Sequence, residues 1–118
     1  MELSRFEKLN IWTESYRLTK NVYRLTVDCP AIERYGLVSQ VRRSASSVGV
    51  NIAEGSGKRT SGDFRRFLAI SKGSVYETIQ HLMLLRDLSF VDSDMVSSTI
   101  DDYRRLAASF ASFSASLE

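Results

Sequence analysis

The sequence predicts an all-α fold, a single four-helix bundle whose helices run antiparallel in up-down-up-down order. One proline and six glycines in 118 residues leave long uninterrupted segments, which favours helices over a turn-rich sheet. Apolar residues recur at helical spacing in each of these segments. The predicted connections are short, so consecutive helices must reverse direction. A chain of this length supports one core, and we expect residues 1–118 to form one domain.

The first helix is expected from about Glu7 to Val27, where Cys29-Pro30 ends it because proline disfavours helical geometry in the preceding residue. It carries two apolar stripes. We predict that the core stripe consists of Leu9, Trp12, Tyr16, Thr19 and Tyr23. The second stripe is predicted to face another subunit and consists of Ile11, Leu18, Val22 and Leu25. The alternative is one wide core face with a few exposed aliphatic residues.

The second helix is expected within Tyr35–Thr60, and its segment Ser44–Ala53 contains no charged residue. At helical spacing, the side facing the core consists of Val38, Val41, Ala45, Val48 and Ile52. A helix exposed to water normally shows a charged face, and this one does not. We therefore predict a second burial, against another copy of the chain, through Ser46, Gly49, Val50 and Ala53.

Two further helices complete the bundle. The third is expected over Gly62–Leu88, with Ser61 as its N-cap. Its predicted core stripe is Phe64, Phe67, Leu68, Ser71, Val75, Thr78, Leu82 and Leu85. The fourth is expected to start at a cap formed by Asp92 or Ser93 and to end near Ser116. Its inward residues are predicted to be Met95, Val96, Thr99, Tyr103, Leu106, Phe110 and Phe113.

The residues that carry most enzymatic and metal chemistry are scarce. His81 and Cys29 are the only imidazole and thiol, so no metal site or cofactor site is expected. The serines lack a base, and Gly55–Lys58 departs from a phosphate-binding loop because Arg59 follows the lysine. A single cysteine indicates a reducing cytoplasm, and no run approaches the roughly 18 apolar residues of a membrane span. We expect a cytoplasmic protein that is not an enzyme and has no membrane partner.

The distribution of positive charge is more informative than the formal net charge of +2. The segment Lys58–Lys72 holds five cations and one carboxylate. We predict contacts to the phosphates of RNA or DNA from Arg42, Arg43, Lys58, Arg59, Arg65, Arg66 and Lys72. Arg43 and Lys58 lie about 23 Å apart along a helix, so these cations need not form one patch. The alternative is an ordinary solvated face.

Three stretches carry a family resemblance: YGLVSQVRRSA at residues 35–45, SVGVNIAEG at 47–55 and FRRFLAISKGSVYE at 64–77. Together with the spacing of Trp12, Tyr23, Cys29-Pro30 and Glu33, they resemble the four-helix-bundle family of 23S rRNA intervening-sequence proteins. The motif positions are Glu33, Gly36, Leu37, Gln40, Arg42, Arg43, Ser47, Asn51, Glu54, Gly55, Arg59, Phe64, Arg66, Phe67, Gly73, Ser74 and Glu77. Cys29 replaces a usual aromatic residue and Ser71 a usual alanine.

The resemblance implies a small bacterial cytosolic bundle that assembles into a homopentameric ring. Some members are encoded inside insertions in ribosomal RNA genes, and a similar protein, the accessory subunit of diversity-generating retroelements, binds nucleic acid and a reverse transcriptase. Asn51 and Glu54 each need a polar partner on a crowded helix, and Arg43 or a residue of the next protomer is expected to pair with Glu54.

Two functions follow. The preferred one is an oligomeric bundle that binds RNA or DNA through its cations, which a ring would repeat around an axis. The other is an interaction scaffold that presents its surface to one partner protein.

Overall fold

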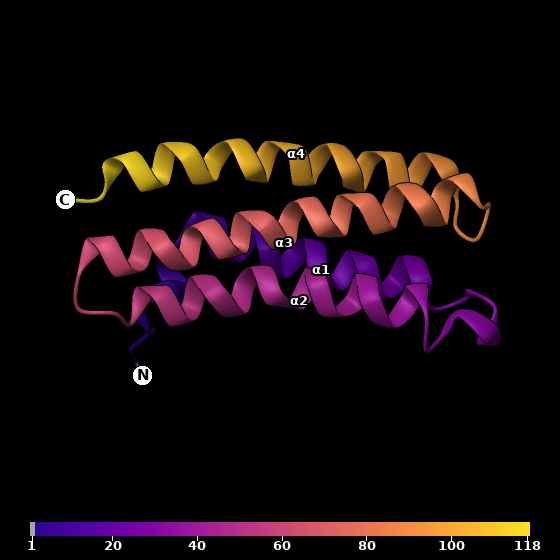
Figure 1. Ribbon diagram of the computed structural model, residues 1–118, viewed down its shortest axis with the longest axis horizontal. Helices are drawn as coiled ribbons and strands as arrows, with labels where there is room; N and C mark the ends of the chain where they lie inside the picture. Colours follow the sequence, from indigo (N-terminus) through magenta and orange to yellow (C-terminus); the bar gives the residue numbers. More distant parts are fainter. Residues whose placement is uncertain (1) are drawn as a thin grey trace.

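A computed structural model describes residues 2–118 of the chain. Its four long helices are α1 (Asn10–Thr26), α2 (Leu37–Ser56), α3 (Ser61–Asp87) and α4 (Ser93–Ser116), and two short 3₁₀ turns are η1 (Arg5–Lys8) and η2 (Ala31–Glu33) (Figure 1). No strand occurs in this part of the chain, and the predicted all-α class with four helices is confirmed. Within the same residues, no helix combines the length and hydropathy that crossing a bilayer requires.

The helices lie side by side along a long axis of 45 Å. The α1–α2 and α3–α4 connections lie at one end, and the α2–α3 turn lies at the other end with the C-terminus (Figure 1). Helix α1 contacts α2 and α4, and α3 contacts the same two helices, so each helix packs against two others. We call the end with the α2–α3 turn the turn end, and the opposite one the connection end.

Side-chain caps set the starts of α3 and α4. Helix α3 is capped by the Thr60 hydroxyl, which accepts a hydrogen bond from the Asp63 backbone N–H at 3.1 Å. The predicted cap, Ser61, is instead the first helical residue, because the extended backbone that a cap needs is found at Thr60. At α4 the predicted cap is confirmed: the Asp92 carboxylate accepts from the Met95 N–H at 2.9 Å.

The core fills the space between the four helices. The largest fully buried side chains are Tyr103, Phe64 and Phe110, surrounded by aliphatic residues from every helix. All five inward residues predicted for α2 are buried. Phe67 and Phe113 are partly buried, and Met95 is 58% exposed, so its predicted inward position is wrong.

The two stripes predicted for α1 are largely exchanged. Ile11, Leu18 and Val22 are buried in the core of the protomer, so the prediction that they face another subunit is wrong. Tyr16 and Tyr23, predicted to be core residues, are 53% and 46% exposed. Both stripes are apolar, but aliphatic side chains have no polar atom to keep in water, whereas a tyrosine hydroxyl favours a half-exposed position. The apolar stripe of α1 that stays partly exposed outside the core is therefore the one that carries the aromatic side chains.

Candidate nucleic-acid interface

The seven cations predicted to contact nucleic acid are divided between distant parts of the bundle. Arg42 and Arg43 lie on the first two turns of α2, toward the connection end. Lys58 and Arg59 lie in the α2–α3 turn, and Arg65, Arg66 and Lys72 lie on α3. The structure therefore does not bring the seven together into one patch.

Arg42 is bound to the end of α1. Its Nε donates to the Thr26 hydroxyl at 3.0 Å, and its Nη2 donates to the Tyr23 carbonyl at 3.4 Å. The guanidinium also lies 4.5 Å from the centre of the Tyr23 ring. Cations near helix C-termini are favoured because the last carbonyls lack helical partners and carry partial negative charge. Arg42 thus stabilises the contact between α1 and α2, and its donors face the protein.

Arg65 binds backbone carbonyls at the C-terminal end of α4. Its Nε donates to the Ser114 carbonyl at 3.3 Å, and its Nη2 donates to the Leu117 carbonyl. Arg5 donates similarly from Nη1 to the Ser56 carbonyl at the end of α2, at 3.4 Å. Three helix C-termini are thus each held by an arginine, and two of these arginines were predicted to bind phosphate.

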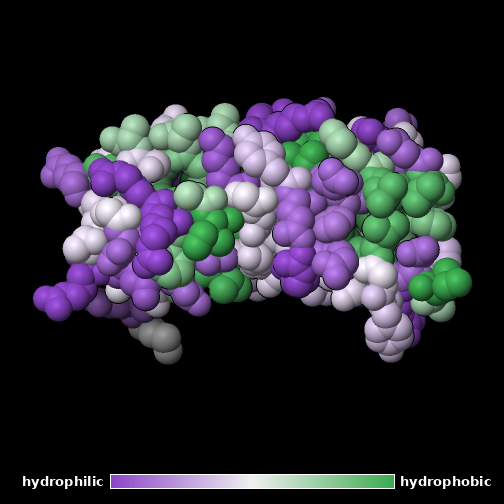
Figure 2. Space-filling model, viewed as in Figure 1, coloured by the Kyte–Doolittle hydropathy of each residue, from purple (hydrophilic) through white to green (hydrophobic). Residues whose placement is uncertain are grey.

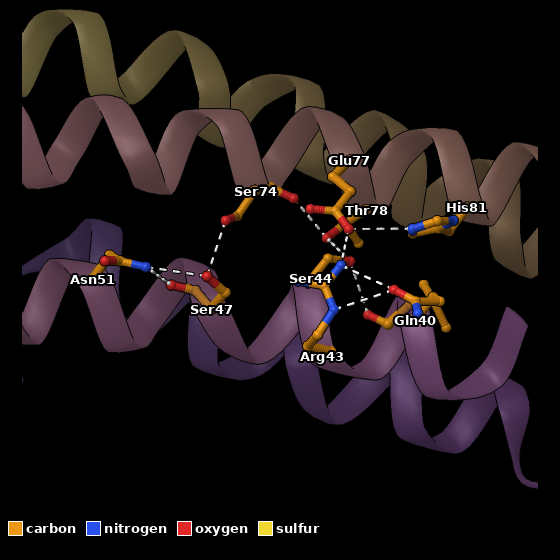
Figure 3. Close-up of polar contacts among 10 residues, drawn as sticks. Gln40, Arg43, Ser44, Ser47, Asn51, Ser74, Glu77, Thr78 and His81 are labelled. Atoms are coloured by element: carbon orange, nitrogen blue, oxygen red, sulfur yellow. Dashed lines mark hydrogen bonds and ion pairs between the residues drawn. The ribbon is translucent and has the colours of Figure 1, made fainter. Parts of the chain in front are cut away.

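Arg43 belongs to a polar row between α2 and α3 (Figure 3). Its guanidinium pairs with the Glu77 carboxylate and donates to the Gln40 side-chain oxygen at 3.1 Å and 3.2 Å. The same carboxylate lies 3.4 Å from Nε2 of His81. The expected pairing of Arg43 with Glu54 is wrong, because the two lie three turns apart, about 16 Å along α2. The alternative, a residue of the next protomer as the partner of Glu54, stays a prediction.

The row continues toward the turn end (Figure 3). The Asn51 amide donates to the Ser47 carbonyl at 2.9 Å and to its hydroxyl at 3.1 Å, and that hydroxyl lies 3.0 Å from the hydroxyl of Ser74. The predicted need of Asn51 for a partner is thus met within its own helix. Two buried members of the row also bond: the Thr78 hydroxyl donates to the Ser44 hydroxyl at 2.8 Å.

Several members of the row were motif positions in the sequence, namely Gln40, Arg43, Ser47, Asn51, Ser74 and Glu77. Sequence reasoning missed that they meet, and it missed His81, which is partly buried at the end of the row. The spacing of Ser44, Ser47 and Asn51 on α2 against Ser74 and Thr78 on α3 could have indicated a shared seam. Because these groups bond one another, the row joins α2 to α3.

Three of the remaining cations, Lys58, Arg59 and Arg66, lie at the turn end, whereas Lys72 lies about 17 Å further along α3. Nζ of Lys58 lies 5.1 Å and the guanidinium of Arg66 lies 5.2 Å from the centre of the Phe67 ring. Arg66 also pairs with Asp63 at 3.7 Å, with both side chains more than half exposed. Arg59 is exposed and forms no hydrogen bond or ion pair within residues 2–118. Lys72 borders a shallow hollow of about 180 Å³ beside Arg65. In Figure 2 the turn end, on the left, is rich in hydrophilic residues.

A separate apolar groove of about 290 Å³ lies between α1 and α2. It contains all four of the interface residues predicted for α2, and its full lining is Phe6, Trp12, Tyr16, Thr19, Ser46, Gly49, Val50 and Ala53. Trp12 stacks on Tyr16 with ring centres 4.9 Å apart, and a side chain at Gly49 would meet Ser15 and Trp12. Leu25 is the fourth residue of α1 that was predicted to face another subunit. It is partly buried and lines another hollow, between α1 and α4.

The family model of the 23S rRNA-intervening sequence protein matches residues 7–112. The chain belongs to this family. A solved structure with the same fold is a protein of unknown function from the S23 ribosomal protein family of Bacteroides thetaiotaomicron. It is 22% identical to this chain, the match covers 87% of this chain and 96% of that one, and the TM-score is 0.78. No curated protein matches the chain.

In this member of the 23S rRNA-intervening sequence protein family, the groups with chemical reactivity are dispersed. Residues 2–118 contain no group of three histidine, cysteine or acidic side chains that could hold a metal ion. The Cys29 thiol donates to the Phe90 carbonyl at 3.6 Å, and burial raises its pKa, which disfavours the reactive thiolate. The absence of catalysis and of cofactors stays a prediction.

Proposed function

We propose that the protein is a non-enzymatic, oligomeric bundle that binds the phosphate backbone of RNA or DNA at its turn end. The observation that carries the proposal is the arrangement of Lys58, Arg59 and Arg66. All three are exposed and lie within nine residues of the chain, and their donors are not bound to helix carbonyls. Arg42, Arg43 and Arg65 are not part of the proposed interface, because their guanidinium groups bind Thr26, Glu77 and helix ends.

The charges around the turn support contact with an anion. An exposed ion pair such as Arg66–Asp63 contributes about 0–1 kcal/mol, so a phosphate can share the guanidinium at little cost. Helix α3 begins at Ser61, and its first N–H groups add partial positive charge next to Arg59. Phosphate contacts of this kind carry no base information, so affinity is expected to be independent of sequence and strongly dependent on salt.

Assembly is the second part of the proposal. The groove between α1 and α2 has no charged side chain in its lining, and Tyr16 and Val50 within it are each about half exposed to solvent. We propose a second copy of the chain as its occupant, in contact through other apolar residues such as Ile70, Tyr76 and Leu84 of α3. Two different surfaces in contact form a closed ring when the rotation closes. The resemblance implies five subunits, and a ring would present the turn-end cations several times over.

A salt series tests the nucleic-acid proposal. Fluorescence anisotropy is measured with labelled single-stranded RNA, single-stranded DNA and duplex DNA between low and physiological salt. The variant K58A/R59A/R66A removes the three turn-end cations, and the matched control R24A/R34A/R104A removes three exposed cations elsewhere. We expect the first variant to lose most of its affinity and to reduce the single-strand salt slope by about 2, at roughly 0.7 per contact. Equal loss in both variants, or no binding by the wild type at low salt, would refute the proposal.

A protein partner remains the second candidate, because the connection end is apolar. Val27, Ile32, Tyr35 and Leu88 lie there and are more than half exposed, and Figure 2 shows hydrophobic residues gathered on this side. A partner protein with an apolar patch would cover them. A complex purified with the wild type after nuclease treatment, and lost in I32S/Y35S, would support this candidate. A partner retained equally by I32S/Y35S would contradict it.

A further inference from the structure

We infer that Phe67 positions the phosphate-binding cations: its ring holds Lys58 and Arg66 together as a preformed pair for one phosphodiester group. The inference rests on the proposed function, since it concerns the same end of the bundle. Phe67 itself would not touch the nucleic acid. It would act through the two cationic side chains that approach its ring.

Two cations from different segments of the chain approach the same aromatic ring. Lys58 comes from the α2–α3 turn and Arg66 from the second turn of α3, yet both approach the same ring, at 5.1 Å and 5.2 Å from its centre. Like charges held in one place repel each other, and the negative face of an aromatic ring is a group that attracts both. An anion bound between them would remove the remaining repulsion. The pair is thus arranged for a ligand with at least one negative charge.

The ring has a rigid support. Gly55, on the last turn of α2, faces the base of Phe67 so closely that an added Cβ would lie 2.7 Å from Cβ of Phe67. The same Cβ would lie 2.8 Å from Cδ1 of Phe64, which is buried in the core. Helices α2 and α3 therefore approach each other closely where the ring is attached. Long cationic side chains lose much conformational freedom on binding, and a fixed ring reduces that loss.

The arrangement also specifies the class of ligand. Bases stack on exposed aromatic faces, but the π surface of Phe67 is occupied by the two cations. No base-stacking contribution is therefore expected from this ring. The ligand that fits is the phosphodiester backbone itself, which is common to every nucleic-acid sequence.

The test replaces the ring while keeping an apolar side chain. Affinity for a labelled 20-nucleotide oligo(U) RNA and for a mixed-sequence RNA of the same length is measured for wild type, F67L, F67Y and the control F90L. Phe90 is a partly buried aromatic residue at the connection end. We expect F67L to bind both RNAs about three- to tenfold more weakly, because the two cationic side chains, no longer fixed by the ring, would lose more conformational freedom on binding. F67Y keeps a ring and should bind within about twofold of wild type, as should F90L.

The outcomes separate this inference from the proposed function. If K58A/R59A/R66A loses binding while F67L binds like the wild type, the proposed function stands and the inference is wrong. If F67Y is as weak as F67L, ring chemistry is not the cause, and the inference is again overturned. Failure of the wild type to bind at all would refute both.

A second measurement needs no variant. In the folded wild type, the ε-methylene protons of Lys58 should show an upfield NMR shift from the ring current of Phe67, because Nζ lies over that ring. A random-coil shift for these protons would overturn the inference even if F67L did not fold.

Discussion

Replacing Gly55 with alanine should destabilise the bundle, whereas the same replacement at Gly73 should stabilise it. Both glycines lie inside helices, with Gly55 in α2 and Gly73 in α3, and neither has a positive φ. Alanine therefore gains about 0.8–1 kcal/mol of helix propensity at Gly73, in the interior of α3, and at most that at Gly55, the last residue but one of α2. The two sites differ in what the new methyl group would meet, so the pair isolates the effect of packing.

At Gly55 the added Cβ would lie 2.7 Å from Cβ of Phe67 and 2.8 Å from the Phe64 ring. A Cβ atom cannot move without the backbone of its helix, so α2 and α3 must separate. Overpacking costs about 1–3 kcal/mol, and we expect the upper part of that range here. After the propensity gain is subtracted, Gly55→Ala should lower the free energy of unfolding by about 2 kcal/mol.

At Gly73 an added Cβ meets nothing within 4 Å among the described residues. The propensity gain is therefore not opposed, and Gly73→Ala should raise the free energy of unfolding by about 0.5–1 kcal/mol. Urea unfolding followed by circular dichroism measures both values. If Gly55→Ala were as stable as Gly73→Ala, the close approach of α2 and α3 at the turn end would be wrong, and with it the support assigned to Phe67.

Other predictions concern single side chains. The Tyr103 hydroxyl is buried and forms no hydrogen bond of ordinary geometry within residues 2–118, although the Thr19 hydroxyl partly offsets the rise in pKa that burial causes. Tyr103→Phe should therefore leave the free energy of unfolding unchanged or raise it by up to about 1 kcal/mol; a clear loss would show that Thr19 is a true hydrogen-bond partner. Burial raises the pKa of Asp102, but bonds from Arg17 and Arg105 outweigh it and hold the pKa below its usual range. The stability from Asp102 is therefore present above its unfolded pKa, at about pH 4, and is lost as the pH falls through the lower folded pKa. Asp102→Asn should cost about 1 kcal/mol in urea unfolding at pH 7 and less as the pH falls below about 4; an equal cost across this range would contradict this. Arg42→Ala should lower the unfolding free energy by about 1–2 kcal/mol without changing RNA affinity in the anisotropy assay, and an affinity loss would return Arg42 to the interface.

Much of the fold could be predicted from local patterns. Helical spacing located α3 and α4 to within about one residue, and proline at position 30 correctly marked the end of α1. The inward residues of α2 were predicted because that helix has one continuous aliphatic stripe. Each of these features is a property of neighbouring residues in the chain.

The errors arose where the sequence offered two sets of residues of the same chemical kind, either two apolar stripes or several arginines, for different roles. On α1 the choice between Leu18 and Tyr16 as core residues depends on the shape of the space left by α2 and α4, which spacing does not contain. For the arginines, the sequence shows the positive charge but not which backbone carbonyl the guanidinium group will contact. Arg42 and Arg65 approach helix ends 16 and 49 residues away in the chain. Tertiary contacts of this kind separate structural cations from those free to bind a ligand.

The position of the nucleic acid on the bundle is the most direct test of the turn-end interface. A photo-crosslinking residue, p-benzoylphenylalanine, is placed at Gly62 in the turn end or at Ala31 in the connection end, both exposed. Each protein is irradiated with labelled RNA at low salt. We expect a crosslink from position 62 that disappears as salt rises, and little or none from position 31. Equal crosslinking from both ends, or a crosslink from position 31 alone, would contradict the account.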